Sequence, residues 1–237
     1  MNVALKLIEQ QIAKSEYRSR AEENALRLGR FVMEDGTALG PCLLISRECG
    51  SGGSLLAQQV GRHLGWNVFD AAIVDEIAQS AHVHQKLLQS VDERVWSGWE
   101  RAWRDILLDD KSDEKYLRHL KQVIMVLGLH GNVVLVGRGA QYLLPPQCAL
   151  RVRLYAPLEI RIERISELEK LTPKEARLKI KKVDAERNAF IWKVFRQDAA
   201  ASLNYDLLIN TAEFSIEKTT ALVLAAMEQK LGVRSKR

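Results

Sequence analysis

The stretch LLISRECGSGGSLLAQQVGRHLG, residues 43–65, combines three consecutive patterns that decide the fold. An apolar run at 43–45 is typical of a buried strand, and glycine and serine alone occupy residues 50–53. From Ser54 the apolar residues recur at helical spacing, and Gly65 ends the predicted helix. A strand, a glycine loop and a helix in this order form a phosphate cradle, because bare backbone N–H groups approach the anion and the helix N-terminus adds partial positive charge.

This loop departs from the standard phosphate-binding pattern. The pattern GxxxxGK[ST] has a lysine after its last glycine, and this chain has Gly53 at that position. Short stretches of glycine and serine are more often ordinary turns. The phosphate-binding interpretation therefore depends on the rest of the chain.

Length and composition predict one good-sized globular domain, or one domain with an added segment. The chain has 237 residues, of which 47% are hydrophobic, enough for a packed core. The formal net charge is +5, but the basic residues are scattered, which argues against a nucleic-acid partner. A mild basic excess also suits a protein that handles phosphorylated small molecules.

The cysteines and the N-terminal residues indicate the compartment. Cys42, Cys49 and Cys148 are odd in number, include no CxxC pair and have no histidine at metal-ligand spacing, which favours a reducing environment and disfavours a zinc site. Charged residues within the first twenty positions argue against a signal peptide. No apolar run is long enough to span a membrane, so we expect a cytoplasmic protein without a membrane partner.

Residues 2–30 are predicted to form an amphipathic helix. Its apolar face would contain Leu5, Ile8, Ile12, Ala21, Ala25 and Leu28. A break at residues 36–41 separates this helical extension, residues 1–40, from a main domain at 41–237. Three alternatives follow: a helix packed on its own domain, a helix packed on a second copy in a homo-oligomer, and a regulatory arm. The first two together are the commonest case.

The main domain alternates strands with helices. Strands are predicted at 43–45, 67–69, 133–136, 150–155 and 205–211, with helices at 71–80, 116–129, from 157, from 172 and at 215–231. This alternation predicts βαβ crossovers and a mostly parallel sheet that is covered on both faces.

Two segments of the main domain carry polar side chains suited to ligand binding. Arg138 lies between two glycines after the strand at 133–136, which places it at the carboxyl edge of the sheet, where open α/β folds bind ligands; the alternative is a surface arginine in a loop. Thr172 and Glu175 form a predicted capping box that opens a helix rich in lysine and arginine. Such a charge run is usually a solvated face, and it is also what a mobile lid over phosphates would carry.

Two other patterns have ordinary structural interpretations. His82 and His84 could bind a metal, but no other ligands accompany them, which favours a solvated helix end. Trp96, Trp99 and Trp103 lie at helical spacing and are expected in the core or on a partner surface, with stacking on a nucleobase as the minority interpretation.

In this order the segments resemble the cytidylate kinase-like family, which is related to the nucleoside monophosphate kinases, over about residues 43–231. The resemblance is carried by ISRECGSGGSLLAQQVGRHLGWNVFD, VLVGRGAQYLL, LYAPLEIRIERI, KKVDAERNAF and YDLLINT. Each segment alone is a weak signal, but five in the right order are fairly specific. The resemblance implies a P-loop kinase-type doubly wound sheet of about five parallel strands, with a helical lid at about residues 170–200.

The resemblance implies transfer of the γ-phosphoryl group of ATP, with Mg²⁺, to a nucleoside monophosphate or similar small acceptor, cytidine monophosphate being the leading candidate. This chemistry requires two phosphates held in line, exclusion of water and surrounding positive charge. On this resemblance the ATP phosphates are bound by the backbone of Gly50, Ser51, Gly52 and Gly53, and Mg²⁺ by the hydroxyl of Ser54 or Ser51. Arg138 would bind the acceptor, and Asp70 would orient the acceptor or a metal-bound water. Closure over the phosphates is the implied role of Arg161, Arg164 and Arg187, and Asp184 would pair with a lid arginine.

Four positions depart from authentic cytidylate kinases. Gly53 replaces the loop lysine, and Arg47 is the candidate to supply its charge. Asp75 and Glu76 stand where authentic enzymes have a tyrosine and an arginine that grips the acceptor phosphate, and Gly139 replaces an aspartate. Loss of one transition-state donor typically lowers the rate by about 10²–10³.

Three hypotheses follow from the sequence. The first is a phosphotransferase, suggested by the ordered glycines and arginines. The second is a catalytically weak or inactive nucleotide-binding regulatory module, suggested by the missing lysine and the extra N-terminal helix. The third is a structural or interaction protein that uses the tryptophans and the first helix as contact surfaces.

Overall fold

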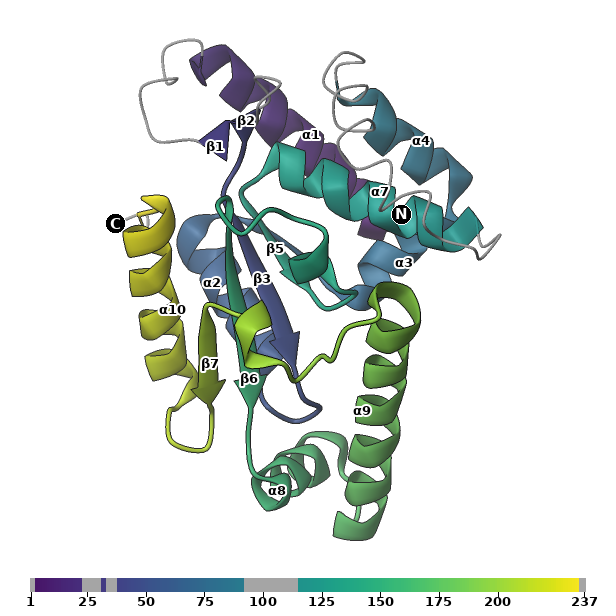
Figure 1. The fold of residues 1–237 in the computed structure, drawn as a ribbon, viewed down its shortest axis with the longest axis vertical. Coiled ribbons are helices and arrows are strands. Elements are labelled where there is room, and N and C mark those ends of the chain that lie inside the picture. The colour runs from purple at the N-terminus through teal and green to yellow at the C-terminus, as the bar shows by residue number, and fades with distance from the viewer. Residues whose placement is uncertain (1–2, 23–30, 33–37, 92–114, 235–237) are drawn as a thin grey trace.

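The computed structural model describes residues 3–22, 31–32, 38–91 and 115–234. At its centre lies a parallel sheet in the order β4-β5-β3-β6-β7 (Figure 1). Its strands are β3 (Cys42–Arg47), β4 (Asn67–Phe69), β5 (Val133–Val136), β6 (Ala149–Tyr155) and β7 (Leu207–Asn210). The predicted five-stranded parallel sheet is therefore confirmed. A separate antiparallel pair, β1 (Phe31–Val32) with β2 (Ala38–Leu39), was not predicted.

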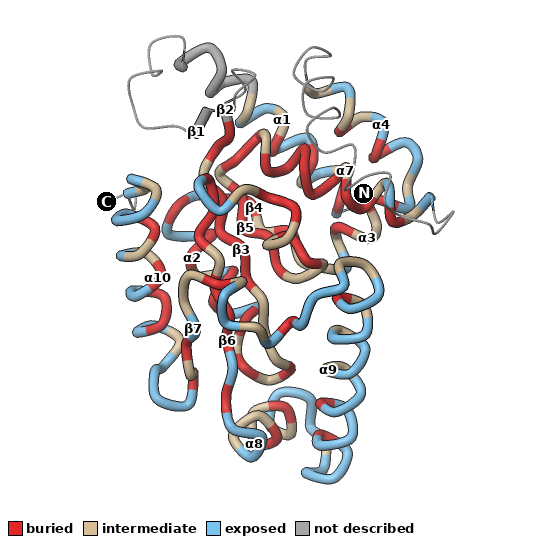
Figure 2. The backbone as a smooth tube through the Cα atoms, viewed as in Figure 1, coloured by how far each residue is buried: buried red, intermediate tan, exposed pale blue. Residues whose placement is uncertain are grey.

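Helices cover both faces of this sheet. The helices are α1 (Val3–Glu22), α2 (Gly53–Leu64), α3 (Ala71–Gln79), α4 (Ala81–Gln89), α7 (Lys115–His130), α8 (Leu158–Glu169), α9 (Pro173–Phe195) and α10 (Ile216–Leu231). One apolar cluster joins the sheet to α1, α3, α4 and α7, and a second joins it to α2 and α10. Figure 2 shows the buried strands between helices whose outer faces are exposed. This arrangement is the doubly wound fold predicted from the alternation of strands and helices.

Alternation along β3 explains why both faces are covered. Leu44 belongs to the first cluster, whereas Leu43 and Ile45 belong to the second. Successive side chains of a strand point to opposite faces, so an unbroken apolar run needs helices on both sides. The run of apolar residues in β5 divides between the two clusters in the same way.

The register of the sheet brings three strand ends together. Ile45 of β3 lies opposite Val136 of β5 and Val152 of β6. Immediately beyond this level, the backbone N–H of Gly137 donates to the carbonyl oxygen of Ile45 at 2.9 Å. The residues that follow β3 and β5 and the last part of β6 therefore share one edge of the sheet.

Local signals set the ends of two helices as expected. Gly65 adopts a left-handed conformation, φ +68°, at the end of α2. At the start of α9 the Thr172 hydroxyl accepts the N–H of Glu175 at 3.3 Å, and the Glu175 carboxylate accepts the N–H of Thr172 at 2.9 Å. Both the predicted glycine stop and the predicted capping box are confirmed.

Helix α1 packs on the main domain. Its Ala4 and Ile8 are fully buried against α3, α4 and α7. The buried side chain of Gln11 donates to the carbonyl oxygen of Gly131 at 2.9 Å and accepts from the Asn67 amide at 2.9 Å. These contacts agree with the first of the three alternatives, a helix packed on its own domain.

One histidine differs from its expected environment. His84 was predicted at a solvated helix end, but it is only 6% exposed, and its ring stacks on that of His119 with centroids 4.0 Å apart. Packing of α4 on α7 buries it, and burial together with the nearby His119 lowers the pKa of His84 to about 4. The described residues include no cluster of His, Cys, Asp and Glu side chains suited to a metal ion.

Two further sequence predictions concern the cysteines and the tryptophans. All three cysteines are buried. The Trp96, Trp99 and Trp103 stripe falls within 92–114 and lies outside the described residues. Within the described ranges, none of the helices has both the length and the apolar character needed to cross a membrane.

The packing of α1 predicts a large cost for truncating its buried face. Ile8→Ala should lower the free energy of unfolding by about 2–4 kcal/mol, because it leaves a cavity between α1 and the helices beneath it. Val3→Ala in the same helix is the control, since Val3 is 62% exposed and should change stability by less than about 0.5 kcal/mol. Urea unfolding of the full chain measures both, and equal small effects would show that α1 does not contribute to the core.

The buried His130 predicts acid sensitivity. Burial lowers its pKa to about 4, whereas an unfolded histidine titrates near 6.5. The unfolded chain therefore binds a proton first, so this stability is present above about pH 6.5 and is lost as the pH falls toward 4. Between pH 7 and pH 5 the loss from His130 should be roughly 2 kcal/mol, and His130→Gln should remove that part of the pH dependence. Urea midpoints at both pH values test this, and parallel pH profiles would contradict it.

Candidate active site

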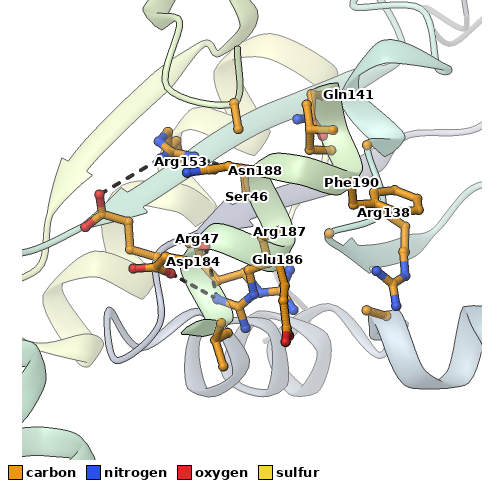
Figure 3. A pocket seen from close by; sticks show the side chains of 17 residues that line it. Ser46, Arg47, Arg138, Gln141, Arg153, Asp184, Glu186, Arg187, Asn188 and Phe190 are labelled. Atoms are coloured by element: carbon orange, nitrogen blue, oxygen red, sulfur yellow. Dashed lines mark hydrogen bonds and ion pairs between the residues drawn. The ribbon is translucent and has the colours of Figure 1, made fainter. Parts of the chain in front are cut away.

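A cavity of about 340 Å³ lies at the shared edge of the sheet, between the strand ends and α9 (Figure 3). The charged side chains in its wall are four arginines and three carboxylates: Arg47, Arg138, Arg153, Arg187, Glu48, Asp184 and Glu186. Apolar and neutral residues complete the wall, among them Gln141, Asn188 and Phe190. The position agrees with the general rule that open α/β sheets bind ligands at the carboxyl ends of their strands.

The glycine loop beside this cavity has the backbone conformation of an anion cradle. Gly50 and Gly52 have φ angles of +83° and +86°, which residues other than glycine rarely adopt. Gly52 is also the N-cap of α2, and no side chain caps the first turn of that helix. The N-terminal N–H groups of α2 are therefore not bound by a capping side chain.

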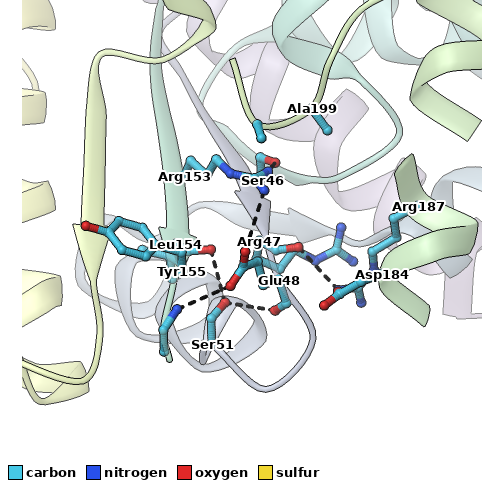
Figure 4. Close-up of polar contacts among 12 residues, drawn as sticks. Ser46, Arg47, Glu48, Ser51, Arg153, Leu154, Tyr155, Asp184, Arg187 and Ala199 are labelled. Carbon is cyan, nitrogen blue, oxygen red and sulfur yellow. Dashed lines mark hydrogen bonds and ion pairs between the residues drawn. The ribbon is translucent and has the colours of Figure 1, made fainter. Parts of the chain in front are cut away.

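The two candidate metal-binding hydroxyls of the loop differ in their surroundings. Ser51 is buried, and its hydroxyl donates to the carbonyl oxygen of Glu48 at 2.8 Å (Figure 4). The carbonyl oxygen of Leu154 in β6 is a second acceptor for this hydroxyl, at 3.3 Å. Ser51 therefore holds the loop on β6. Ser54 is exposed in the first turn of α2, so it is the hydroxyl that remains accessible for Mg²⁺.

Arg47 occupies the space that a lysine at position 53 would need. A Cβ atom on Gly53 would lie 2.7 Å from Cγ of Arg47, and a Cβ on Gly137 would overlap the Arg47 guanidinium. The arginine therefore extends from the start of the loop across to the end of β5. Burial and the nearby positive charge of Arg187 together lower its pKa to about 10, against the opposing charge of Asp70, so Arg47 stays charged at neutral pH.

Asp70 lies close enough to Arg47 to act on its charge, and it also begins α3. Its carboxylate accepts the backbone N–H of Ile73 at 3.0 Å and caps that helix. The carboxylate is therefore fixed at the end of β4.

The three predicted closing arginines have different positions. Arg187 of α9 lines the cavity and donates to the carbonyl oxygen of Arg47 at 3.3 Å. Arg161 donates to backbone oxygens of Ala156 and Cys49, at 3.0 and 3.3 Å. Arg164 donates to the Thr211 hydroxyl and carbonyl oxygens, at 2.9 and 2.6 Å. Arg161 and Arg164 thus support the loop from α8, and neither lines the cavity.

Asp184 connects α9 to the glycine loop. Its carboxylate accepts the backbone N–H of Cys49 at 2.8 Å and pairs with Arg161 at 2.6 Å. Arg187 lies at 3.9 Å from the same carboxylate. The Asp184 carboxylate therefore occupies the backbone N–H of Cys49, which directly precedes the glycine loop.

Arg138 has an unusual backbone and a fixed side chain. Gly137, Arg138 and Gly139 all have positive φ angles, +87°, +53° and +72°. The Arg138 guanidinium makes a two-point ion pair with Asp75, in which Nε donates to Oδ1 at 2.8 Å and Nη2 donates to Oδ2. Phe190 lies under it, with the ring centroid 4.8 Å from Cζ. Arg138 is therefore a cavity residue and not a free surface arginine.

The space beside Gly139 is closed by an aromatic ring. A Cβ atom at this position would overlap Phe195 of α9. Position 139 is where authentic cytidylate kinases have an aspartate, so α9 here fills the room that such a side chain would take.

Sequence reasoning missed several residues of this site. Arg153 is 9% exposed, donates to the Ser46 hydroxyl at 3.0 Å and lies 4.0 Å from Glu48. The sequence feature that could have identified Arg153 is its position as a charged residue within a predicted strand that is otherwise largely buried. The partnership of Asp75 with Arg138 joins residues 63 positions apart, and no local pattern indicates it.

The comparisons with known proteins agree with this architecture. The model of the cytidylate kinase-like family matches residues 43–213, more than half of the chain. A cytidylate kinase from Pyrococcus horikoshii is 25% identical over 187 residues, 78% of this chain and 88% of the relative. One from Methanopyrus kandleri is 24% identical over 189 residues, with 76% and 89% covered. The solved structure of an uncharacterized protein from Eubacterium ventriosum shares the fold, with a TM-score of 0.66, 19% identity, and 80% of this chain and 98% of that chain covered.

The packing of Arg47 on Gly53 predicts a reversal in a double-mutant cycle. Gly53→Ala alone should lower the free energy of unfolding by about 1–3 kcal/mol, because the new methyl group meets the stem of Arg47. In an Arg47→Gly background both Cγ and Cβ of residue 47, which would lie 2.7 and 2.8 Å from the new methyl group, are gone, and the same change should be neutral or stabilising, since alanine is the better helix former. Urea unfolding of the four proteins measures the coupling, and simple additivity would contradict the close contact.

Proposed function

Because the chain belongs to the cytidylate kinase-like family, we propose that it is a phosphotransferase that moves the γ-phosphoryl group of ATP to a small acceptor, with nucleoside monophosphates such as cytidine monophosphate as the first candidates. The observation that carries the proposal is the convergence of four arginines on one cavity beside an anion-binding loop. Phosphoryl transfer needs positioning and positive charge more than covalent chemistry, and this site supplies both.

The loop fits the phosphates of ATP. Its two left-handed glycines leave bare backbone, and α2 begins without a side-chain cap. The first turn of a helix in this state offers N–H groups and partial positive charge to an anion. Ser54 would hold Mg²⁺, and the ion would neutralise part of the phosphate charge.

The arginines would divide the remaining work. Arg47 would supply the charge that a loop lysine provides in the standard pattern, because its stem fills the lysine position and its guanidinium reaches the end of β5. Arg187 would approach from α9, and Arg138 would hold the acceptor from the opposite wall. Phe190 and Ile191 of α9 add an apolar lining, which helps to exclude water while the lid helix covers the cavity.

A second candidate function is a nucleotide-binding regulatory module with little or no turnover. The observation that favours it is the carboxylate of Asp184 on the N–H of Cys49 and on Arg161, because an ATP phosphate at this part of the loop would compete with it. Position 53 also lacks the lysine. Both functions use the same nucleotide site, but only the phosphotransferase passes the γ-phosphoryl group on to an acceptor.

A coupled phosphotransfer assay with Mg-ATP separates the two functions. The acceptors are cytidine, deoxycytidine, uridine, adenosine and guanosine monophosphates. Turnover should prefer one acceptor, and Arg47→Ala should lower kcat by about 10²–10³, the usual cost of losing one transition-state donor. Arg177→Ala is the control, since this arginine of α9 pairs with exposed Glu159 and is outside the cavity.

Each outcome of this assay is informative. A wild-type chain that binds ATP but transfers phosphate to none of the acceptors would favour the regulatory module. Equal losses in the Arg47 and Arg177 variants would contradict the role given to Arg47. A chain that binds no ATP would contradict both functions.

A further inference from the structure

The Arg138 guanidinium is held along one edge and on one face by other residues of the chain. Asp75 of α3 takes the Nε–Nη2 edge of the guanidinium, and the ring of Phe190 covers one face. Within the described residues, no hydrogen bond occupies Nη1. The side chain is 27% exposed, and the residue lines the cavity (Figure 3). One donor-rich edge is therefore left for a ligand.

Asp75 is itself fixed by a second helix. The hydroxyl of Tyr116 in α7 donates to Oδ1 of Asp75 at 2.7 Å, the same oxygen that accepts from Nε of Arg138. Helices α3 and α7 pack directly on one another, and the Asp75 side chain is 19% exposed. Tyrosine, aspartate and arginine thus form a chain of contacts that ends at the cavity wall.

The Arg138 guanidinium stays positively charged beside Asp75. Burial lowers the pKa of the Arg138 guanidinium, but the hydrogen bonds and charge of Asp75 outweigh burial and raise it, so the group is cationic at any ordinary pH. A guanidinium that keeps one edge on a carboxylate can present its other N–H groups to a phosphate oxygen.

The backbone conformation at Arg138 also fixes the position of this residue. A non-glycine residue at φ +53° between two left-handed glycines is conformationally costly and persists because its surroundings hold it. Arg47 and Phe195 fill the space beside the two glycines, so the segment has little room to move. Both the main chain and the side chain of Arg138 are therefore preset.

We propose that Asp75 is a positioning residue for the acceptor: it aims the free edge of Arg138 at an anionic phosphate group of the acceptor, and Tyr116 holds Asp75 in place. This inference deepens the proposed function and uses its acceptor site. The acceptor class is a compound with a phosphate monoester, and its phosphate approaches Arg138 from the cavity, because Asp75 closes the opposite edge.

Asp75→Asn tests the inference through the acceptor alone. The variant keeps the shape of the side chain but removes the charge, so Arg138 loses its orientation. The KM for the phosphorylated acceptor should rise about 10- to 100-fold, the range expected for a misplaced binding group, while the KM for ATP stays within about twofold. In an Arg138→Ala background the same change should cause no further loss, because Asp75 acts through that arginine.

Asp206→Asn is the matched control. Asp206 makes an equivalent contact with Arg151, in which Nη2 and Nε donate at 2.9 and 3.4 Å, and its side chain is 21% exposed. This pair lies outside the cavity, beside the start of β7. Its loss should lower stability without changing the KM of the acceptor. Equal effects of the Asp75 and Asp206 variants on KM, or a full effect of Asp75→Asn without Arg138, would overturn the proposal.

Equilibrium binding keeps the test independent of turnover. Calorimetry of the full chain with cytidine monophosphate, uridine monophosphate and inorganic phosphate should show binding that Asp75→Asn weakens about 10- to 100-fold. If the chain transfers no phosphate but this dependence is found, the proposed function fails and the inference stands. Binding that ignores Asp75, or no binding of any of these probes to the wild type, would overturn the inference. Should Asp75→Asn fail to fold, Tyr116→Phe carries the test, with an expected loss of about threefold or more.

Discussion

The arrangement of this site depends on one partly buried cation. Arg47 extends from the end of β3 over Gly53 to Gly137, and both glycines are needed because a side chain at either position would meet it. Burial of a guanidinium is costly without compensating charge, and here Asp70 at the end of β4 supplies part of that compensation. The absent lysine of the loop is thus physically linked to the path of this arginine: the two side chains compete for the same volume.

Sheet topology does the rest of the positioning. Because β3 pairs with both β5 and β6 in parallel, the segment after β3, the Gly137–Gly139 turn and Arg153 meet at one edge. Helices α8 and α9 pack on each other through a third apolar cluster that includes Cys49 of the loop. The loop therefore lies between the sheet and helices α8 and α9, and Asp184 connects the loop to α9.

Much of the fold follows from local sequence, and much of the site does not. Periodicity identified every strand of the main sheet, and caps such as Thr172 and Gly65 are local features that the sequence reports directly. His84 was misplaced because its burial comes from α7, 35 residues later. Three arginines that the resemblance implies as ligand-binding residues, Arg47, Arg138 and Arg187, line one cavity, since strand ends converge in this fold. Asp75 and Arg153 were not found, because their partners are distant in the sequence and depend on side-chain packing.

The cavity is basic in composition but nearly balanced in charge. Each arginine in its wall has a carboxylate nearby: Arg47 has Asp70, Arg138 has Asp75, Arg153 has Glu48 and Arg187 has Asp184. This pairing lets four like charges share a small volume, because each mutual repulsion is offset by a local attraction. A phosphate that enters such a site gains little from bulk positive charge. It gains from donors already aimed by their carboxylates, so recognition of the ligand depends on the geometry of these pairs and not on the net charge of the wall.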